Sequence, residues 1–188
     1  MLTEILKEET RTPHQQLEKL LMLRLKNMST TEEYASVLAD FYGFMHPLEK
    51  KIDAFIGTDI LPDYEERRKS DALAEDMRTF GISGGEKGTV PEAELPKIRN
   101  AGEAMGALYV LEGSTLGGKI LTEMISKKLK MDTGKGFSFF SSYGDRVIEM
   151  WKRFQQTLNA LYTAPEERRA VVAAANHTFS GFHQWLKK

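Results

Sequence analysis

The feature that most constrains the fold is a helix-like stretch near the middle of the chain that carries glycine at interior positions. Across residues 107–124 (ALYVLEGSTLGGKILTEM) apolar residues recur at helical spacing, with no proline between them. Gly113, Gly117 and Gly118 lie inside this stretch. Each interior glycine destabilises a helix by about 1 kcal/mol relative to alanine, so the three together cost roughly 3 kcal/mol. We therefore expect something to approach the backbone of this helix closely, in the space that side chains would otherwise fill.

The predicted helix carries further glycines before this stretch, and most of its glycines share one face. At 100° per residue, four of them point within an arc of about 60°: Gly102, Gly106, Gly113 and Gly117. Gly118 points elsewhere, and the Gly117-Gly118 pair is expected to bend the helix. The glycine face admits either a closely packed second helix or a flat ligand, and both interpretations stay open. A phosphate-binding loop is excluded, because GSTLGGK lacks the required spacing and does not join a strand to a helix.

The rest of the chain also has helical periodicity, so we predict an all-α fold. A length of 188 residues, 41% of them hydrophobic, suits one core and one domain spanning residues 1–188. The predicted helices cover residues 2–26, 29–57, 63–81, 98–130, 145–162 and 163–188. Residues 81–96 and 131–144 are predicted loops, and the FSFF segment in the second could form a short strand but has no partner.

Local signals mark several helix ends. Pro13 is expected to start a new helix or to kink the first, and Pro47 to kink the second. Gly81 is a candidate for a helix C-terminus. Two capping boxes are predicted: Thr30 with Glu33, and Thr163 with Glu166 around Pro165.

Composition excludes several classes of function. The chain has 26 basic and 27 acidic residues without long blocks of either sign, which argues against nucleic acid or a membrane surface as a partner. The absence of cysteine excludes a disulfide scaffold and a cysteine nucleophile. The start of the chain does not resemble a signal peptide, and the longest apolar run, residues 170–175, is too short to span a bilayer. We therefore expect a cytoplasmic protein.

One histidine lies in an informative setting near the start of the chain. If the helix runs nearly straight through Pro13, four side chains lie on one side of it: Lys7, Arg11, His14 and Glu18. Glu18 could accept a hydrogen bond from one imidazole nitrogen and leave the other for a metal. Lys7 and Arg11 could bind carboxylates at the edge of a ligand. A surface histidine in a salt-bridged helix explains the same pattern.

The remaining histidines favour no specific chemistry. His46 forms a His-x-x-Glu pair with Glu49, which specifies a metal site poorly, while His177 and His183 suit packing or exposure. The paired Glu-x-x-His motifs of a di-iron bundle are missing, and no serine occupies a nucleophile elbow.

Together, the histidine and glycine patterns resemble one family, the heme oxygenases, over nearly the whole chain. EGSTLGGK (residues 112–119) is similar to the glycine-rich distal helix of that family, especially in its bacterial branch associated with phytochromes. RRKSDALAEDM and LNALYTAPEERRAVVAAANHTF are similar to further family segments in the same order. The resemblance implies a helical domain that holds heme b between the first helix and the glycine-rich helix, with His14 as the iron ligand.

The resemblance also implies a reaction, in which heme is both prosthetic group and substrate. Dioxygen and electrons from a ferredoxin or a reductase cleave it to biliverdin, carbon monoxide and ferrous iron. The site residues implied on the oxygen side are Ser114, Gly113 and Gly117; those implied in heme binding are Lys7, Arg11, His14, Glu18, Gly113, Gly117 and Gly118. Side chains at Gly113 and Gly117 would fill the space that oxygen needs.

Two departures from the family pattern bear on this reading. Ser114 stands where many members carry an aspartate, and it can either hold a water or bond back to the carbonyl of Val110. Trp151 and Gln155 stand where relatives place basic residues for the heme propionates, so the adjacent Lys152 and Arg153 are the candidates here. Two alternatives therefore remain: a non-catalytic heme-binding or heme-sensing protein on the same fold, and an all-α interaction domain whose glycine face is only a packing seam.

Overall fold

Pro13 divides the N-terminal helical segment in two. In the computed structural model, which describes residues 1–67, 69–82 and 88–188, α1 (Leu2–Glu9) ends four residues before Pro13. The proline ring clashes with the carbonyl four residues earlier, so the break belongs there. α2 (Arg11–Asn27) follows at once, with Pro13 in its first turn. The prediction that Pro13 starts a new helix is confirmed.

The second long helix, α3 (Thr31–Asp53), begins at the predicted Thr30–Glu33 capping box. It continues through Pro47, whose missing N–H leaves the Gly43 carbonyl without a helical donor. The N–H of Val90 donates to that carbonyl instead, at 2.9 Å. Because of Pro47, the Gly43 carbonyl accepts its hydrogen bond from a distant loop and not from its own helix.

The predicted helix 63–81 ends at Gly81, as its glycine indicates. A short 3-10 turn, η1 (Tyr64–Glu66), precedes α4 (Asp71–Thr79), and Gly81 ends the run at a φ of 72°. The predicted loop 81–96 contains a 3-10 turn, η2 (Glu92–Glu94); its residues 83–87 lie outside the described part of the chain.

The predicted helix 98–130 is divided into three parts. These are α5 (Ala101–Gly113), the 3-10 segment η3 (Ser114–Gly117) and α6 (Gly118–Leu129). The change of helix type begins at the glycine-rich region, because glycine tolerates departures from α-helical geometry more readily than other residues.

FSFF forms α7 (Ser138–Ser141), one turn of helix rather than a strand. The buried carboxyl of Asp76 on α4 caps this turn by accepting the N–H groups of Ser138 and Phe139, each at 2.8 Å. Burial raises the pKa of Asp76 above its ordinary value, although the two N–H donors oppose that shift. The capping carboxyl lies 62 residues before the turn, so local sequence does not reveal it.

The last two helices follow a further 3-10 turn, η4 (Gly144–Arg146). They are α8 (Val147–Leu161) and α9 (Pro165–Trp185). The predicted Thr163–Glu166 capping box is shifted by one residue. Pro165 occupies the first helical position, which makes Ala164 the N-cap, and the Glu167 side chain accepts the N–H of Ala164 at 3.2 Å.

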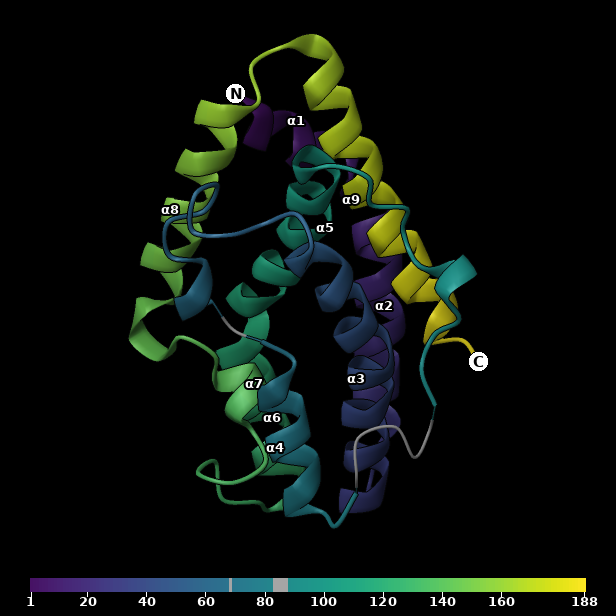
Figure 1. Cartoon of the computed structure of the whole chain (residues 1–188). Coiled ribbons are helices and arrows are strands. Elements are labelled where there is room, and N and C mark those ends of the chain that lie inside the picture. Colours follow the sequence, from purple (N-terminus) through teal and green to yellow (C-terminus); the bar gives the residue numbers. More distant parts are fainter. Residues whose placement is uncertain (68, 83–87) are drawn as a thin grey trace.

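The core forms where α5 lies beside α9, with α3 against both (Figure 1). A Cβ added to Gly106 would lie 2.2 Å from the Val171 carbonyl oxygen on α9, so only glycine permits this approach. Buried aromatic rings extend the core, with Phe182 of α9 at 4.9 Å from Phe41 and 4.8 Å from Phe44 between ring centroids. Across the described ranges the chain contains helices and no strand, which confirms the all-α prediction. None of the helices within these ranges is long and apolar enough to cross a membrane.

Candidate functional site

The site is built around His14, in the second turn of α2. Its Nε2 lies 3.1 Å from Oε1 of Glu18, one turn further along the helix, and its side chain is 49% exposed. The imidazole rests on the ring of Phe179 from α9, with 5.0 Å between centroids. The helix spacing and the aromatic support fix the ring, and one ring nitrogen faces Glu18 while the other faces away from it.

The basic residues predicted beside His14 lie on two helices. Lys7 is exposed on α1, whereas Arg11 is the first residue of α2 and pairs with Glu8. The break at Thr10 therefore separates Lys7 from the helix that carries Arg11, His14 and Glu18. All four remain within the same two-helix segment at the start of the chain.

The glycine-bearing run interacts with the chain near both ends of α2. Near the start of α2, Thr10 is hydrogen bonded to Tyr109 of α5; burial raises the pKa of this tyrosine, and Thr10 opposes the shift. Near its end, the Lys128 ammonium of α6 donates to the Lys26 carbonyl. His14 lies between these contacts on α2, and Gly113 and Gly117 lie between them on the glycine-bearing run.

The glycine face divides into a packed half and an open half. Gly102 faces the Tyr162 ring, 3.2 Å from an added Cβ, and Gly106 faces α9, so this half is a packing seam. In the second half, a Cβ on Gly113 would lie 3.8 Å from the Trp151 ring, and one on Gly117 would meet no atom within 4 Å. The packing interpretation is therefore confirmed for Gly102 and Gly106, and a ligand against Gly113 and Gly117 stays a prediction.

Gly118 belongs to neither half. A Cβ there would lie 2.0 Å from the carbonyl oxygen of Phe140 on α7, so the glycine is needed for packing. The structure gives Gly118 this packing role, and its contact with heme stays a prediction.

Large apolar side chains are exposed on α2 and on the glycine-bearing run, although Leu23 lies on the side of α2 opposite His14. Leu23 of α2 is 57% exposed, while Leu116 of η3 and Ile120 of α6 are 40% and 69% exposed. Leu116 and Ile120, which flank Gly117 in sequence, are apolar side chains of the kind that contact a flat apolar ligand.

The hydroxyl of Ser114 bonds back into its own helix. Its Oγ donates to the Leu111 carbonyl at 2.6 Å, and Oγ of Thr115 donates to the Glu112 carbonyl at 2.7 Å. The sequence interpretation named Val110 as the possible acceptor. The acceptor is one residue closer because the helix tightens to 3-10 geometry at this point.

On α8, Trp151 is half-buried beside Tyr109, with 5.4 Å between ring centroids. Lys152 and Arg153 are both exposed. Arg153 pairs with Glu149 at 2.5 Å and approaches Asp63 at 4.0 Å. Of the two candidates on α8, Arg153 is therefore already engaged by carboxylates.

His46 has a structural partner. Its Nδ1 lies 2.9 Å from the hydroxyl of Ser70, which in turn bonds to Glu49, and its ring stacks on Tyr42. Among residues 1–67, 69–82 and 88–188 no group of three or more histidine, aspartate or glutamate side chains is arranged to hold a metal ion.

Sequence reasoning missed a buried charged cluster at the end of α5. Arg67 donates from Nη1 to Oε2 of Glu112 at 2.7 Å and from Nη2 to Oδ1 of Asp63 at 2.8 Å. The hydroxyl of Tyr143 donates to Oε1 of Glu112 at 2.9 Å. The one available signal was Glu112 itself, because a charge in an apolar helical run needs a buried partner.

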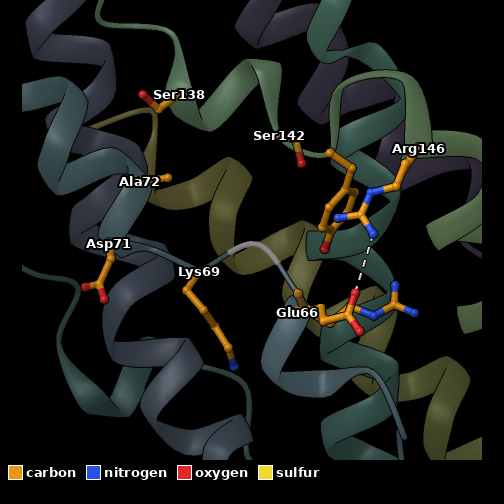
Figure 2. Close-up of a pocket in the computed structure, with 9 residues that line it drawn as sticks. Glu66, Lys69, Asp71, Ala72, Ser138, Ser142 and Arg146 are labelled. Atoms are coloured by element: carbon orange, nitrogen blue, oxygen red, sulfur yellow. Dashed lines mark hydrogen bonds and ion pairs between the residues drawn. The ribbon is translucent and has the colours of Figure 1, made fainter.

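A pocket of about 370 Å³ opens on the outer side of this cluster (Figure 2). Arg67 and Tyr143 line it, and the Arg146–Glu66 ion pair, 3.5 Å long, lies at its edge. Lys69, also in the lining, pairs with Asp53 at 3.0 Å. The pocket contains none of the site residues predicted from the sequence.

Comparison with known proteins identifies the class. The chain matches the family described as Heme oxygenase over residues 1–188. It is 28% identical to a heme oxygenase of Xanthomonas campestris over 155 residues, which cover 82% of this chain and 89% of the relative. It is also 28% identical to heme oxygenase PigA of Pseudomonas aeruginosa over 181 residues, covering 95% of this chain and 88% of the relative.

Solved structures show the same fold. The NO- and CO-bound heme oxygenase from Neisseria meningitidis superimposes with a TM-score of 0.83 at 23% identity, covering 100% of this chain and 90% of the other. The heme oxygenase from Leptospira interrogans gives 0.76 at 20% identity, with 98% of each chain covered. The chain is all-helical and matches this family over its whole length. It is therefore an enzyme of the class that degrades heme. The chain belongs to the heme oxygenase family.

Proposed function

We propose that this chain cleaves heme b to biliverdin, carbon monoxide and ferrous iron, with dioxygen and with electrons from a ferredoxin or a reductase. One observation carries the proposal: His14 is accessible and held by Glu18, and Gly117 of the glycine-bearing run has open space where a side chain would lie. The proposal treats residues 1–188 as one heme oxygenase-like domain. A cytoplasmic location stays a prediction from the sequence.

In this proposal His14 binds the iron through the ring nitrogen that faces away from Glu18. The Glu18 carboxylate orients the ring and increases the basicity of the ligand, as partners of metal-binding histidines commonly do. Phe179 supports the ring from behind. When bound, heme supplies the iron for oxygen chemistry and is itself the macrocycle that is cleaved.

Lys7 and Arg11 are proposed to bind the propionates. Both are exposed and lie within two turns of His14, and an arginine can bind a carboxylate through two parallel hydrogen bonds. Lys152 and Arg153 are the proposed additional cations from α8. To bind a propionate, Arg11 would first have to leave Glu8, and Arg153 would have to leave Glu149.

Gly113 and Gly117 are proposed to leave room for oxygen on the face opposite His14. Ser114 is proposed to hold a water there. Because its one hydroxyl proton is donated to the Leu111 carbonyl, the oxygen of Ser114 serves as an acceptor from that water. Ser114 therefore positions a water and does not itself supply a proton.

The experiment is a titration of the purified protein with hemin, followed by reductant and air. We expect a Soret band of histidine-ligated heme and then the absorbance of biliverdin. His14→Ala should lose the ligation signature and the product, and His46→Ala, whose ring bonds to Ser70, should keep both. An unchanged heme spectrum and biliverdin yield in His14→Ala would overturn the assignment of the ligand.

A non-catalytic heme-binding protein is the second candidate, and Ser114 in place of the family aspartate is the observation that favours it. The same titration decides between the two, because that protein would give the Soret band and no biliverdin under reductant and air.

A further inference from the structure

A cluster of buried charges at the end of α5 has no part in the proposed chemistry. Glu112, the residue directly before Gly113, is 1% exposed, and Arg67 is 3% exposed. With Asp63 and Tyr143 they form a set that we call the Glu112 cluster. Every charged atom of the guanidinium fork faces a protein acceptor: Nη1 faces Glu112, while Nε and Nη2 face Asp63 at 2.9 and 2.8 Å.

The Glu112 cluster joins three separate segments to the end of α5. Arg67 and Asp63 flank η1, and Tyr143 directly precedes η4. Nη1 of Arg67 also donates to the Met150 carbonyl of α8 at 3.0 Å. Burial alone would lower the pKa of Arg67, but the Glu112 and Asp63 carboxylates outweigh it and raise that pKa, so the arginine stays charged.

Stability does not explain such an arrangement. A buried ion pair is commonly replaceable by apolar side chains of similar size without loss of stability, because taking the charges out of water offsets their attraction. A directional set of hydrogen bonds provides defined geometry instead. Glu112 held by Arg67 and Tyr143 cannot shift along or around the axis of α5 without breaking those bonds.

The segment that follows, residues 113–117, begins and ends with glycine, and Thr115 is its buried side chain. The hydroxyls of Ser114 and Thr115 bond within the helix, and Gly117 meets no neighbour in the direction of a side chain. Its far end is anchored where Gly118 packs on Phe140. Glu112 is directly attached to the near end, so its hydrogen bonds anchor the segment on that side.

We propose that the Glu112 cluster is a positioning element for heme cleavage: it fixes the backbone of residues 113–117 above the heme, and Glu112 acts through that backbone without touching heme. The inference rests on the proposed function. A small displacement of a positioned group can lower a rate by on the order of a hundredfold, so the effect should be large for the reaction and small for binding.

The test compares Glu112→Gln with a matched control, Glu103→Gln. Glu103 lies on the same helix, its side chain is 8% exposed, and it pairs with an arginine, Arg99, but at the opposite end of α5. Three quantities are measured: amide hydrogen exchange of residues 113–118 in the heme-free protein, heme affinity, and the rate of biliverdin formation at saturating hemin.

For Glu112→Gln we expect at least about tenfold faster exchange at residues 113–118 and a biliverdin rate lower by about tenfold or more, with heme affinity within about threefold of wild type. Glu103→Gln should leave exchange at 113–118 and the rate within about twofold. Equal exchange at 113–118 in the two variants would overturn the proposal.

Two further variants keep the proposal testable if Glu112→Gln fails to fold. Tyr143→Phe removes one hydroxyl from the cluster and should show the same changes in smaller measure; wild-type exchange and rate in this variant would count against positioning. In the variant Asp63→Asn/Arg67→Met/Glu112→Met, uncharged side chains replace all three charges of the cluster. A restored melting temperature with an impaired rate and fast exchange supports positioning, whereas full recovery of the rate shows that the cluster only fills space.

A failure of the proposed function gives a different result. If the wild-type protein binds hemin but forms no biliverdin, the reaction assignment is wrong. The exchange measurement on the heme-free protein then still decides whether the Glu112 cluster fixes the glycine segment.

Discussion

Replacing Gly117 by leucine tests whether the open half of the glycine face serves a ligand. No atom lies within 4 Å of the position that a Cβ would occupy, so the new side chain meets no protein neighbour at its base. Leucine favours helix over glycine by about 1 kcal/mol. For a chain of this size, 1 kcal/mol corresponds to about 2–4 °C in melting temperature. The heme-free variant should therefore melt at the wild-type temperature or up to about 4 °C above it.

The same substitution should abolish or greatly reduce biliverdin formation, because leucine fills the space proposed for oxygen. The assays are thermal unfolding of the heme-free protein by circular dichroism and product absorbance under reductant and air. A packing seam would behave in the opposite way. Overpacking by several methylene groups costs about 1–3 kcal/mol, which would lower the melting temperature by several degrees. Such a loss, or undiminished product, would refute the reasoning.

Gly118→Ala is the matched control for that prediction. The added methyl would lie 2.0 Å from the Phe140 carbonyl oxygen and 3.0 Å from its carbon, so backbone must move. We expect a loss of at least about 1–3 kcal/mol from this smaller substitution at the adjacent position. Two neighbouring glycines should thus respond in opposite directions in the same melt.

Further predictions concern the iron ligand, the distal serine and a buried cap. His14→Ala should lose biliverdin formation while retaining some heme through apolar contacts, and His46→Ala should keep the Soret band of the wild type; the reverse pattern would exchange their roles. Ser114→Ala should slow biliverdin formation by no more than about ten- to a hundredfold, roughly 1.4 to 2.7 kcal/mol of barrier, and unchanged turnover would place the ordered water elsewhere. Asp76→Asn should destabilise the heme-free protein by about 1–3 kcal/mol, because an amide cannot accept both N–H groups that cap α7. The exposed Asp71→Asn serves as its control in the same denaturant titration, and equal midpoints would contradict the capping role.

Helix ends that depend on local chemistry could be predicted from the sequence. The Thr30–Glu33 box, the new helix at Pro13 and the stop at Gly81 each involve residues within one or two turns of one another. Where a neighbouring residue competed for the same role, the prediction was wrong by one position. Pro165 moved the N-cap to Ala164, because a proline at the first helical position fixes which residue precedes it.

Contacts between distant segments could not be predicted in this way. The sequence pattern of the glycine face is the same whether a helix or a ligand lies against it. The position of α9 in the fold shows which of these glycines pack against a helix: Gly106 does, whereas Gly117 meets no neighbour. Likewise, Glu112 and Arg67 are 45 residues apart, and nothing in the local sequence names one as the partner of the other. The candidate site residues themselves stay predictions that the proposed experiments test.

Pro47 has a consequence for how the molecule opens. The Gly43 carbonyl loses its helical donor to the proline and accepts a bond from Val90 across the fold instead. Gly43 has no side chain to keep Gly88 and Trp185 apart from it. If residues 88–90 detach, a buried carbonyl loses its donor in the middle of α3. Local fraying of that loop is therefore coupled to the core helix, and the two should exchange their amide hydrogens as one cooperative unit. Because Pro47 removes one hydrogen bond from α3, we expect the surface segment 88–90 to open with the same free energy as the core helix.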